Sequence, residues 1–135
     1  MRSRMIVGSL LLLGVLSAGS LATRGDGVAP PRQWALASFT DPVLVASQIL
    51  MGPYLIVHDD AKMERGEPCT TFYRFDLAKG PEEAVVSFHC TPALRKVAGT
   101  LVLTQTDVNP AIGIRRLTEY QFAGDCEAHG IPARP

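Results

Sequence analysis

Short apolar segments separated by turn-favouring residues fill the chain from Tyr54 onward. Strands are predicted over residues 54–58, 69–77, 84–90, 100–106 and 114–122. Glycine, proline and asparagine between these segments favour tight turns. Consecutive strands with short connections predict a mainly β fold: a small antiparallel meander, curled into a barrel-like domain or packed against one short helix in an α+β variant.

The segment before these strands carries conflicting signals. Residues 34–39 predict a short strand, and a helix is predicted from Asp41-Pro42 to just before Gly52. Aspartate as the N-cap, proline in the first turn and glycine after the last turn are typical of a short helix. The β-branched residues inside this segment favour a strand instead. Residues 59–68 are polar and are predicted as a loop.

Alternation is clearest in the hairpin between Cys69 and Cys90. In its first strand the odd-numbered residues are the more apolar, and in its second strand the even-numbered residues are apolar. Both sets share one face in a register that pairs Thr71 with Phe88 and Cys69 with Cys90. A register shifted by two residues is the alternative, and it would displace Cys69.

The predicted register places two sulfur atoms on opposed positions. Opposed Cα atoms in an antiparallel pair lie about 4.5 or 5.5 Å apart, within the range that a disulfide accepts. The sequence therefore predicts a Cys69–Cys90 disulfide, which would stabilise the fold by about 3 kcal/mol in the chain-entropy view. Two alternatives stay open: both cysteines are reduced and bind a metal, or one of them bonds to Cys126.

Three histidines and the odd cysteine are the remaining candidates for chemistry. Cys126 is a candidate for a free thiol or for a covalent dimer. No cofactor is the first expectation. The alternative is a copper or zinc site built from some of four residues: His58, His89, Cys126 and His129. The sequence has no His-x-His and no Cys-x-x-Cys, and the predicted hairpin register points His89 toward solvent.

Catalytic motifs are absent from the sequence. It contains no Gly-x-Ser-x-Gly, no glycine-rich phosphate loop and no His-Glu-x-x-His. Catalysis would require at least two of His58, Asp59, His89 and Glu119 to meet in one cleft. We therefore predict no catalytic residues and favour a non-enzymatic protein.

The beginning of the chain predicts a secretory signal peptide over residues 1–22. Arg2 and Arg4 precede an apolar run over residues 5–16, which small residues follow. Cleavage is predicted after Ala22 or, nearly as well, after Gly19. The run is shorter than the roughly 20 apolar residues of a membrane span, so an uncleaved anchor is the less favoured alternative. The mature protein is expected in the periplasm or outside the cell.

The rest of the chain is predicted to form one domain. Residues 23–32 predict a flexible lead-in, residues 33–130 a single β-rich domain, and residues 131–135 a tail. Loss of Arg2 and Arg4 lowers Lys+Arg from 13 to 11 against 13 Asp+Glu, so the mature net charge is −2. This charge, without a basic cluster, argues against nucleic acid and anionic membrane surfaces as partners.

Two functions therefore follow from the sequence. The first is an exported, non-catalytic binding or structural domain whose partner the sequence does not identify. The second is a small extracytoplasmic protein that binds copper or zinc, or takes part in redox chemistry, through histidine and cysteine side chains.

Overall fold

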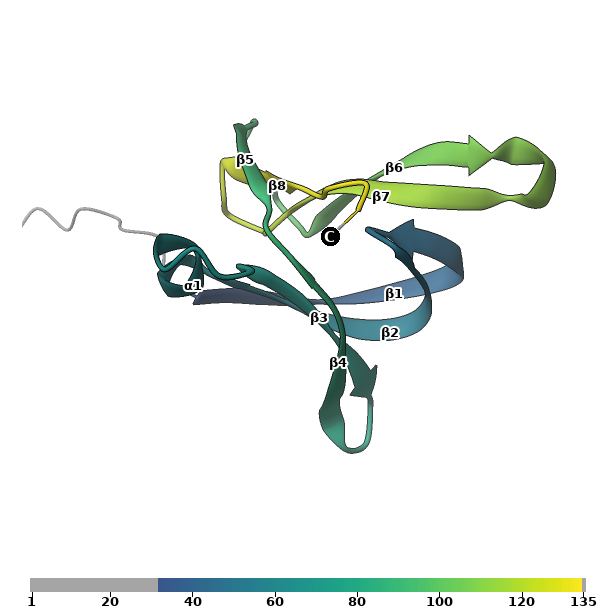
Figure 1. Cartoon of the computed structure of the whole chain (residues 1–135), viewed down its shortest axis with the longest axis horizontal. Coiled ribbons are helices and arrows are strands. Elements are labelled where there is room, and N and C mark those ends of the chain that lie inside the picture. Colours follow the sequence, from purple (N-terminus) through teal and green to yellow (C-terminus); the bar gives the residue numbers. More distant parts are fainter. Residues whose placement is uncertain (1–31, 135) are drawn as a thin grey trace, which may run out of the picture.

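The computed structural model describes residues 32–134, so the predicted signal peptide and nearly all of the lead-in lie outside the described residues. The described chain is a single sheet with one short α-helix and one 3-10 turn, which confirms the predicted mainly β class (Figure 1). Its elements are β1 (Arg32–Val45), β2 (Gln48–Asp59), α1 (Asp60–Glu64), β3 (Thr70–Asp76), β4 (Gly80–Phe88), β5 (Thr91–Leu94), β6 (Val102–Asn109), η1 (Pro110–Ile112), β7 (Ile114–Gln121) and β8 (Glu127–Gly130).

The sheet folds over itself into two layers. Its strand order is β4-β3-β2-β1-β7-β8-β5, and β6 also pairs with β7 along nearly its whole length. Strands β1 to β4 form one layer and β5 to β8 the other (Figure 1). All pairs are antiparallel except the short parallel contact between β1 and β7. The predicted barrel-like closure is not formed, since β4 and β5 at the two ends of the strand order do not pair.

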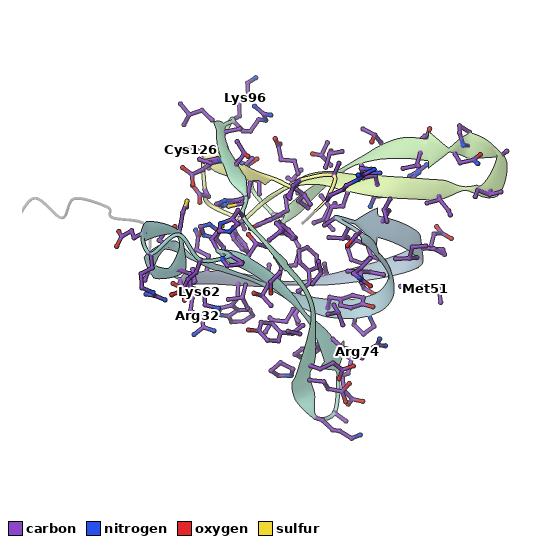
Figure 2. The ribbon with its side chains drawn as sticks, in the orientation of Figure 1. Arg32, Met51, Lys62, Arg74, Lys96 and Cys126 are labelled. Carbon is purple, nitrogen blue, oxygen red and sulfur yellow. The ribbon has the colours of Figure 1, made fainter. Side chains whose placement is uncertain are left out.

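Aromatic side chains join the two layers in the core. Phe72 of β3, Phe88 of β4 and Tyr120 of β7 are all buried. The ring of Phe72 lies 6.0 Å from that of Phe88 and meets Tyr120 edge-on at 6.4 Å. The Tyr120 hydroxyl lies 2.5 Å from Thr70 Oγ1, so its buried oxygen has a hydrogen-bond partner. Side chains fill the space between the layers (Figure 2).

The predicted helix after Asp41 is wrong. This segment belongs to β1 and β2, which form a long hairpin with a tight turn after Val45. Val43 and Val45 are buried in the core, and Leu50 of β2 pairs with Val43. Burial of β-branched side chains on a pleated surface therefore prevails over the helix-end signals of proline and glycine.

The helix occurs instead in the segment predicted as a loop. Asp59 is its N-cap and accepts a hydrogen bond from the backbone N–H of Lys62 at 3.3 Å. The capping carboxylate satisfies a backbone donor that a helix start leaves free, which is why five residues suffice for one turn of helix.

The predicted hairpin register is wrong by one residue near the cysteines. Thr70, rather than Thr71, pairs with Phe88. Thr70 and Phe72 therefore face the core, whereas Tyr73 and Phe75 of the predicted apolar set are only half-buried. The register shifts again between Phe72 and Phe75. Such bulges break strict alternation, so the odd-numbered side chains of the first strand do not all face the core.

Two short strands were not predicted. β5 contains a proline, and β8 has the sequence Glu-Ala-His-Gly, so neither shows apolar alternation. They pair with each other, and β8 also pairs with β7. No helix in the described part of the chain is long and apolar enough to cross a membrane.

The corrected register makes a direct prediction for stability. Phe72→Ala removes an aromatic ring from a fully buried position and should lower the free energy of unfolding by about 3–5 kcal/mol. Leu77→Ala changes a side chain that is 87% exposed and should have an effect below about 0.5 kcal/mol. Urea denaturation followed by circular dichroism measures both. The opposite order would support the register predicted from the sequence, which places Leu77 in the core.

Candidate metal centre

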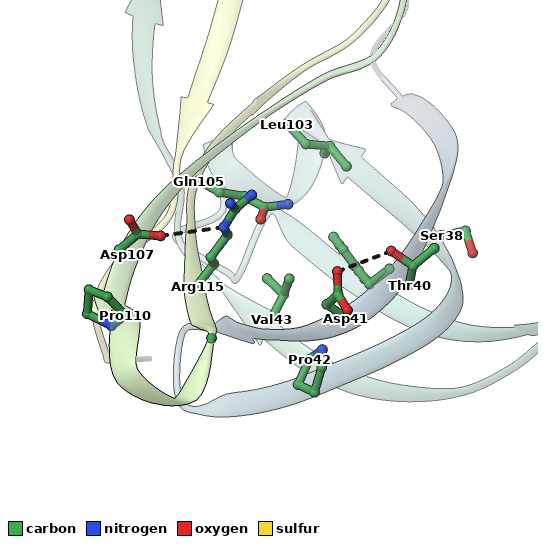
Figure 3. Close-up of a pocket in the computed structure, with 12 residues that line it drawn as sticks. Ser38, Thr40, Asp41, Pro42, Val43, Leu103, Gln105, Asp107, Pro110 and Arg115 are labelled. Carbon is green, nitrogen blue, oxygen red and sulfur yellow. Dashed lines mark hydrogen bonds and ion pairs between the residues drawn. The ribbon is translucent and has the colours of Figure 1, made fainter.

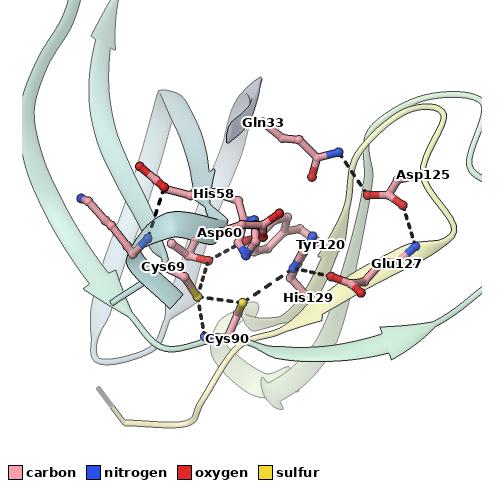
Figure 4. Close-up of polar contacts among 12 residues, drawn as sticks. Gln33, His58, Asp60, Cys69, Cys90, Tyr120, Asp125, Glu127 and His129 are labelled. Atoms are coloured by element: carbon pink, nitrogen blue, oxygen red, sulfur yellow. Dashed lines mark hydrogen bonds and ion pairs between the residues drawn. The ribbon is translucent and has the colours of Figure 1, made fainter. Parts of the chain in front are cut away.

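Two histidines and two cysteines come together between the two layers (Figure 4). His58 lies near the end of β2, Cys69 directly before β3, Cys90 between β4 and β5, and His129 in β8. The chain contains three histidines and three cysteines, so this cluster takes two of each.

Backbone pairing positions all four residues. His58 pairs with Thr70 across β2 and β3, and the Asp59 N–H donates to the Cys69 carbonyl at 2.9 Å. His129 pairs with Tyr120 across β7 and β8. Cys90 is the second residue after the end of β4, and its backbone N–H donates to Cys69 Sγ at 3.3 Å. The cluster therefore depends on the sheet rather than on a mobile loop.

The potential ligand atoms of the cluster are close to one another. One ring nitrogen of His58 and both sulfur atoms lie within 4.8 Å of one another. The two sulfur atoms are 2.9 Å apart, and Cys90 Sγ lies 3.6 Å from His129 Nδ1. The ring centroids of His58 and His129 are 4.1 Å apart. His58, Cys69 and Cys90 therefore form a group of three potential ligands, and His129 lies beside it through Cys90.

These distances can be compared with those of known sulfur chemistry. In a tetrahedral zinc site, two sulfur ligands are about 3.8 Å apart, and adjacent sulfur and nitrogen ligands about 3.5 Å. The distance between Cys90 Sγ and His129 Nδ1 therefore suits a shared ion. The separation between Cys69 Sγ and Cys90 Sγ lies between that of zinc ligands and the roughly 2.05 Å of a disulfide. Both cysteines are free thiols here, so the sulfur atoms approach each other, as predicted, without a bond.

Each buried imidazole has one nitrogen without a partner. His58 and His129 are both 1% exposed, and Nε2 of each has no hydrogen-bond partner in the structure. The other nitrogen of His58, Nδ1, lies 3.4 Å from Asp60 Oδ1. A carboxylate behind a histidine is the usual support of a metal-binding imidazole. An unsatisfied buried polar atom costs about 1–3 kcal/mol, so two in one cluster favour a bound partner.

Burial also sets the protonation of the cluster. It lowers the pKa of His129 to about 4, and the neighbouring His58 acts in the same direction. Burial lowers the pKa of His58 too, although Asp60 opposes this shift. Both imidazoles are therefore neutral at pH 7, which is the form that binds metals. Burial, with the hydrogen bond to Cys69, raises the pKa of Cys90 to about 12, so this sulfur keeps its proton unless a cation replaces it.

Aromatic rings enclose the His129 side of the cluster. Tyr120 stacks on His129 with a centroid distance of 4.9 Å, and Phe122 meets it at 5.8 Å. This packing fixes the imidazole plane and keeps the local dielectric constant low, which strengthens any charge interaction inside the cluster.

The four residues that the sequence predicts as possible metal ligands fall into two groups in the structure. His58 and His129 join the cluster, whereas His89 and Cys126 are exposed, and the sulfur of Cys126 is visible away from the core in Figure 2. Cys69 and Cys90, predicted to form a disulfide, lie in the cluster as free thiols. The neighbourhood of His129 could not be predicted, because β8 lacks the alternation of a strand.

The residues that catalysis would require to meet in one cleft are not brought together. Glu119 forms an ion pair with Arg95 at 2.7 Å, Asp59 caps α1, and His89 is exposed. No described contact joins Glu119 or His89 to His58.

A separate pocket of about 600 Å³ lies between β1 and the hairpin of β6 and β7 (Figure 3). Its charged side chains already have partners: Asp107 lies 3.4 Å from Arg115, and Thr40 donates to Asp41 at 3.5 Å. The pocket therefore offers no unpaired buried group comparable to those of the histidine–cysteine cluster.

Comparison with known proteins adds no function to this geometry. No protein-family model matches the chain, and neither a curated protein nor a solved structure gave a match. Any functional proposal therefore depends on the cluster itself.

The lowered pKa of His129 predicts acid sensitivity of the reduced, metal-free chain. Between its ordinary value of 6.5 and about 4, the unfolded chain holds a proton on this imidazole that the folded chain does not. Stability is therefore complete above this range and falls as the pH decreases through it, by about 3 kcal/mol. His58 acts in the same direction.

Urea denaturation at a series of pH values, with chelator and a phosphine reductant, measures this slope. His129→Gln should flatten it, whereas His89→Gln, at an exposed position, should leave it unchanged. Equal slopes in the two variants would contradict the burial of an uncharged His129.

Proposed function

We propose that this chain is a small metal-binding protein that holds one zinc or copper(I) ion in the histidine–cysteine cluster. The observation that carries the proposal is the approach of His58 and two adjacent thiols to within 4.8 Å of one another, beside buried His129, whose Nδ1 lies 3.6 Å from Cys90 Sγ. Two sulfur and two imidazole donors are a common ligand set for zinc, and thiolates also favour copper(I). Hard cations such as Mg²⁺ and Ca²⁺ prefer oxygen ligands, and none of these four donors is oxygen.

The metal would have a structural role. Four protein ligands complete a tetrahedral site and leave no position for substrate, unlike the open site of a catalytic zinc. His58 and Cys69 belong to the layer of β1 to β4, whereas His129 belongs to the opposite layer. A shared ion would therefore connect the layers and add its binding free energy to the stability of the fold.

Export is a further part of the proposal. It is supported by the charged, apolar and small-residue pattern of residues 1–22. The mature chain would then act in the periplasm or outside the cell as a non-catalytic binding or structural domain. In an oxidising compartment, a Cys69–Cys90 disulfide is the second candidate state of the cluster, favoured by sulfur atoms only 2.9 Å apart. Exposed Cys126 would remain available for a covalent dimer.

Metal titration tests the proposal with controls that the chain itself offers. The reduced protein should bind one equivalent of Zn²⁺ in competition with a chromophoric chelator. Cys69→Ser and His58→Gln should each weaken binding by at least about 100-fold, because each removes one ligand. Cys126→Ser and His89→Gln change the same residue types at exposed positions and should leave the affinity unchanged.

Cobalt(II) gives a readout that does not depend on the stability of the variants. Bound to the reduced wild-type chain, it should show thiolate charge-transfer bands and the intense visible bands of a tetrahedral site. A reduced wild-type chain that binds neither Zn²⁺ nor Cu⁺ would falsify the proposal. Equal losses in the cluster variants and in the exposed variants would assign the binding to another site.

A further inference from the structure

We infer that the oxidation state of Cys69 and Cys90 controls the metal centre: reduced, the two sulfur atoms bind the ion, and bonded to each other, they release it. This inference rests on the proposed function and names the regulation of that site. The metal-bound state and the disulfide state need the same two atoms, Cys69 Sγ and Cys90 Sγ.

The distance between the two sulfur atoms lies midway between that of a disulfide bond and that of two neighbouring zinc ligands. At 2.9 Å, they would separate by about 0.9 Å to become neighbouring zinc ligands, and approach by about the same amount to form a disulfide. A change of this size needs side-chain rotation rather than a new backbone arrangement. A disulfide sulfur carries no negative charge and is a poor ligand, so only two imidazoles would remain for the ion.

The two thiols differ in their access to solvent. Cys69 is 2% exposed, and its sulfur contacts the Thr70 hydroxyl and the Phe88 carbonyl, each at 3.9 Å. Cys90 is half-buried and lies in the segment that passes from one layer to the other. A soluble oxidant would therefore reach Cys90 first, and Cys69 would act as the resolving thiol behind it.

The reaction balances with a low-molecular-weight disulfide as the oxidant. In the loaded centre the ion has replaced the proton of Cys90, so Cys90 Sγ attacks this disulfide as a thiolate, forms a mixed disulfide and displaces one thiolate. The Cys69 thiolate then attacks Cys90 Sγ, forms the Cys69–Cys90 bond and displaces the second thiolate. The two cysteines lose two electrons, the reagent gains two, and the metal ion leaves as a dication.

Metal binding and disulfide formation use the same electron pairs of the two sulfur atoms. Metal and disulfide would therefore exclude each other, and the reducing or oxidising power of the compartment would set the occupancy of the centre.

One titration tests the inference in a Cys126→Ser background, which removes the exposed thiol. The reduced protein is loaded with one equivalent of Zn²⁺ and treated with oxidised glutathione. Released zinc is followed with a chromophoric indicator and the disulfide by intact mass. One zinc should leave per disulfide formed, the oxidised protein should bind zinc at least about 100-fold more weakly, and a phosphine reductant should restore binding.

A trapping experiment tests the order of the two thiols. In the metal-free reduced state, Cys69→Ser should accumulate a glutathione adduct on Cys90, because no resolving thiol remains. Cys90→Ser should form an adduct on Cys69 at least about tenfold more slowly, since that sulfur is buried. Circular dichroism of both variants shows that the comparison is between folded proteins.

The outcomes separate the two proposals. Failure of the reduced chain to load zinc would overturn the metal-binding proposal and the inference together. Zinc retained in the oxidised protein, zinc lost without disulfide formation, or faster modification at Cys69 than at Cys90 would overturn the inference alone.

Discussion

A single sheet has two faces, and this chain covers one of them by folding the sheet onto itself. Only His89 and Cys90 separate β4 of one layer from β5 of the other, so the crossing between layers is short. Interlayer packing of Phe72 against Tyr120 holds the two halves together. Every other feature of the interior follows from this folding, because the crossing and the last strand approach the same region from opposite sides.

The interior that results contains polar groups as well as aromatic ones. The hydroxyl groups of Thr70 and Tyr120 form a hydrogen bond with each other, whereas His58 and His129 each keep a ring nitrogen without a partner. A sequence could avoid this cost with two apolar side chains of similar size, so two unsatisfied imidazoles beside two thiols favour chemistry over packing. The cluster therefore supports a functional hypothesis that the aromatic core alone does not.

Local signals were sufficient for the fold class and for most strands, but not for the details that build the cluster. Residues 54–58 lie in β2, and all but the last residue of the predicted strand 114–122 lie in β7, as their composition predicts. The register near Cys69 depends on Phe72 contacting Tyr120 in the other layer, which no local alternation encodes. Likewise, β8 is a strand only because β5 and β7 pair with it, so the position of His129 was beyond sequence reasoning.

The residues of the cluster are widely spaced along the chain, from His58 in the first hairpin to His129 in the last strand. Contacts of such high sequence separation form late in folding, because the intervening chain must be ordered first. A nascent or truncated chain that ends before β8 has at most three of the four donors. An ion held by all four would therefore mark chains in which β8 is present and paired, and a chain that ends before β8 would be distinguished from one that contains it by its metal content.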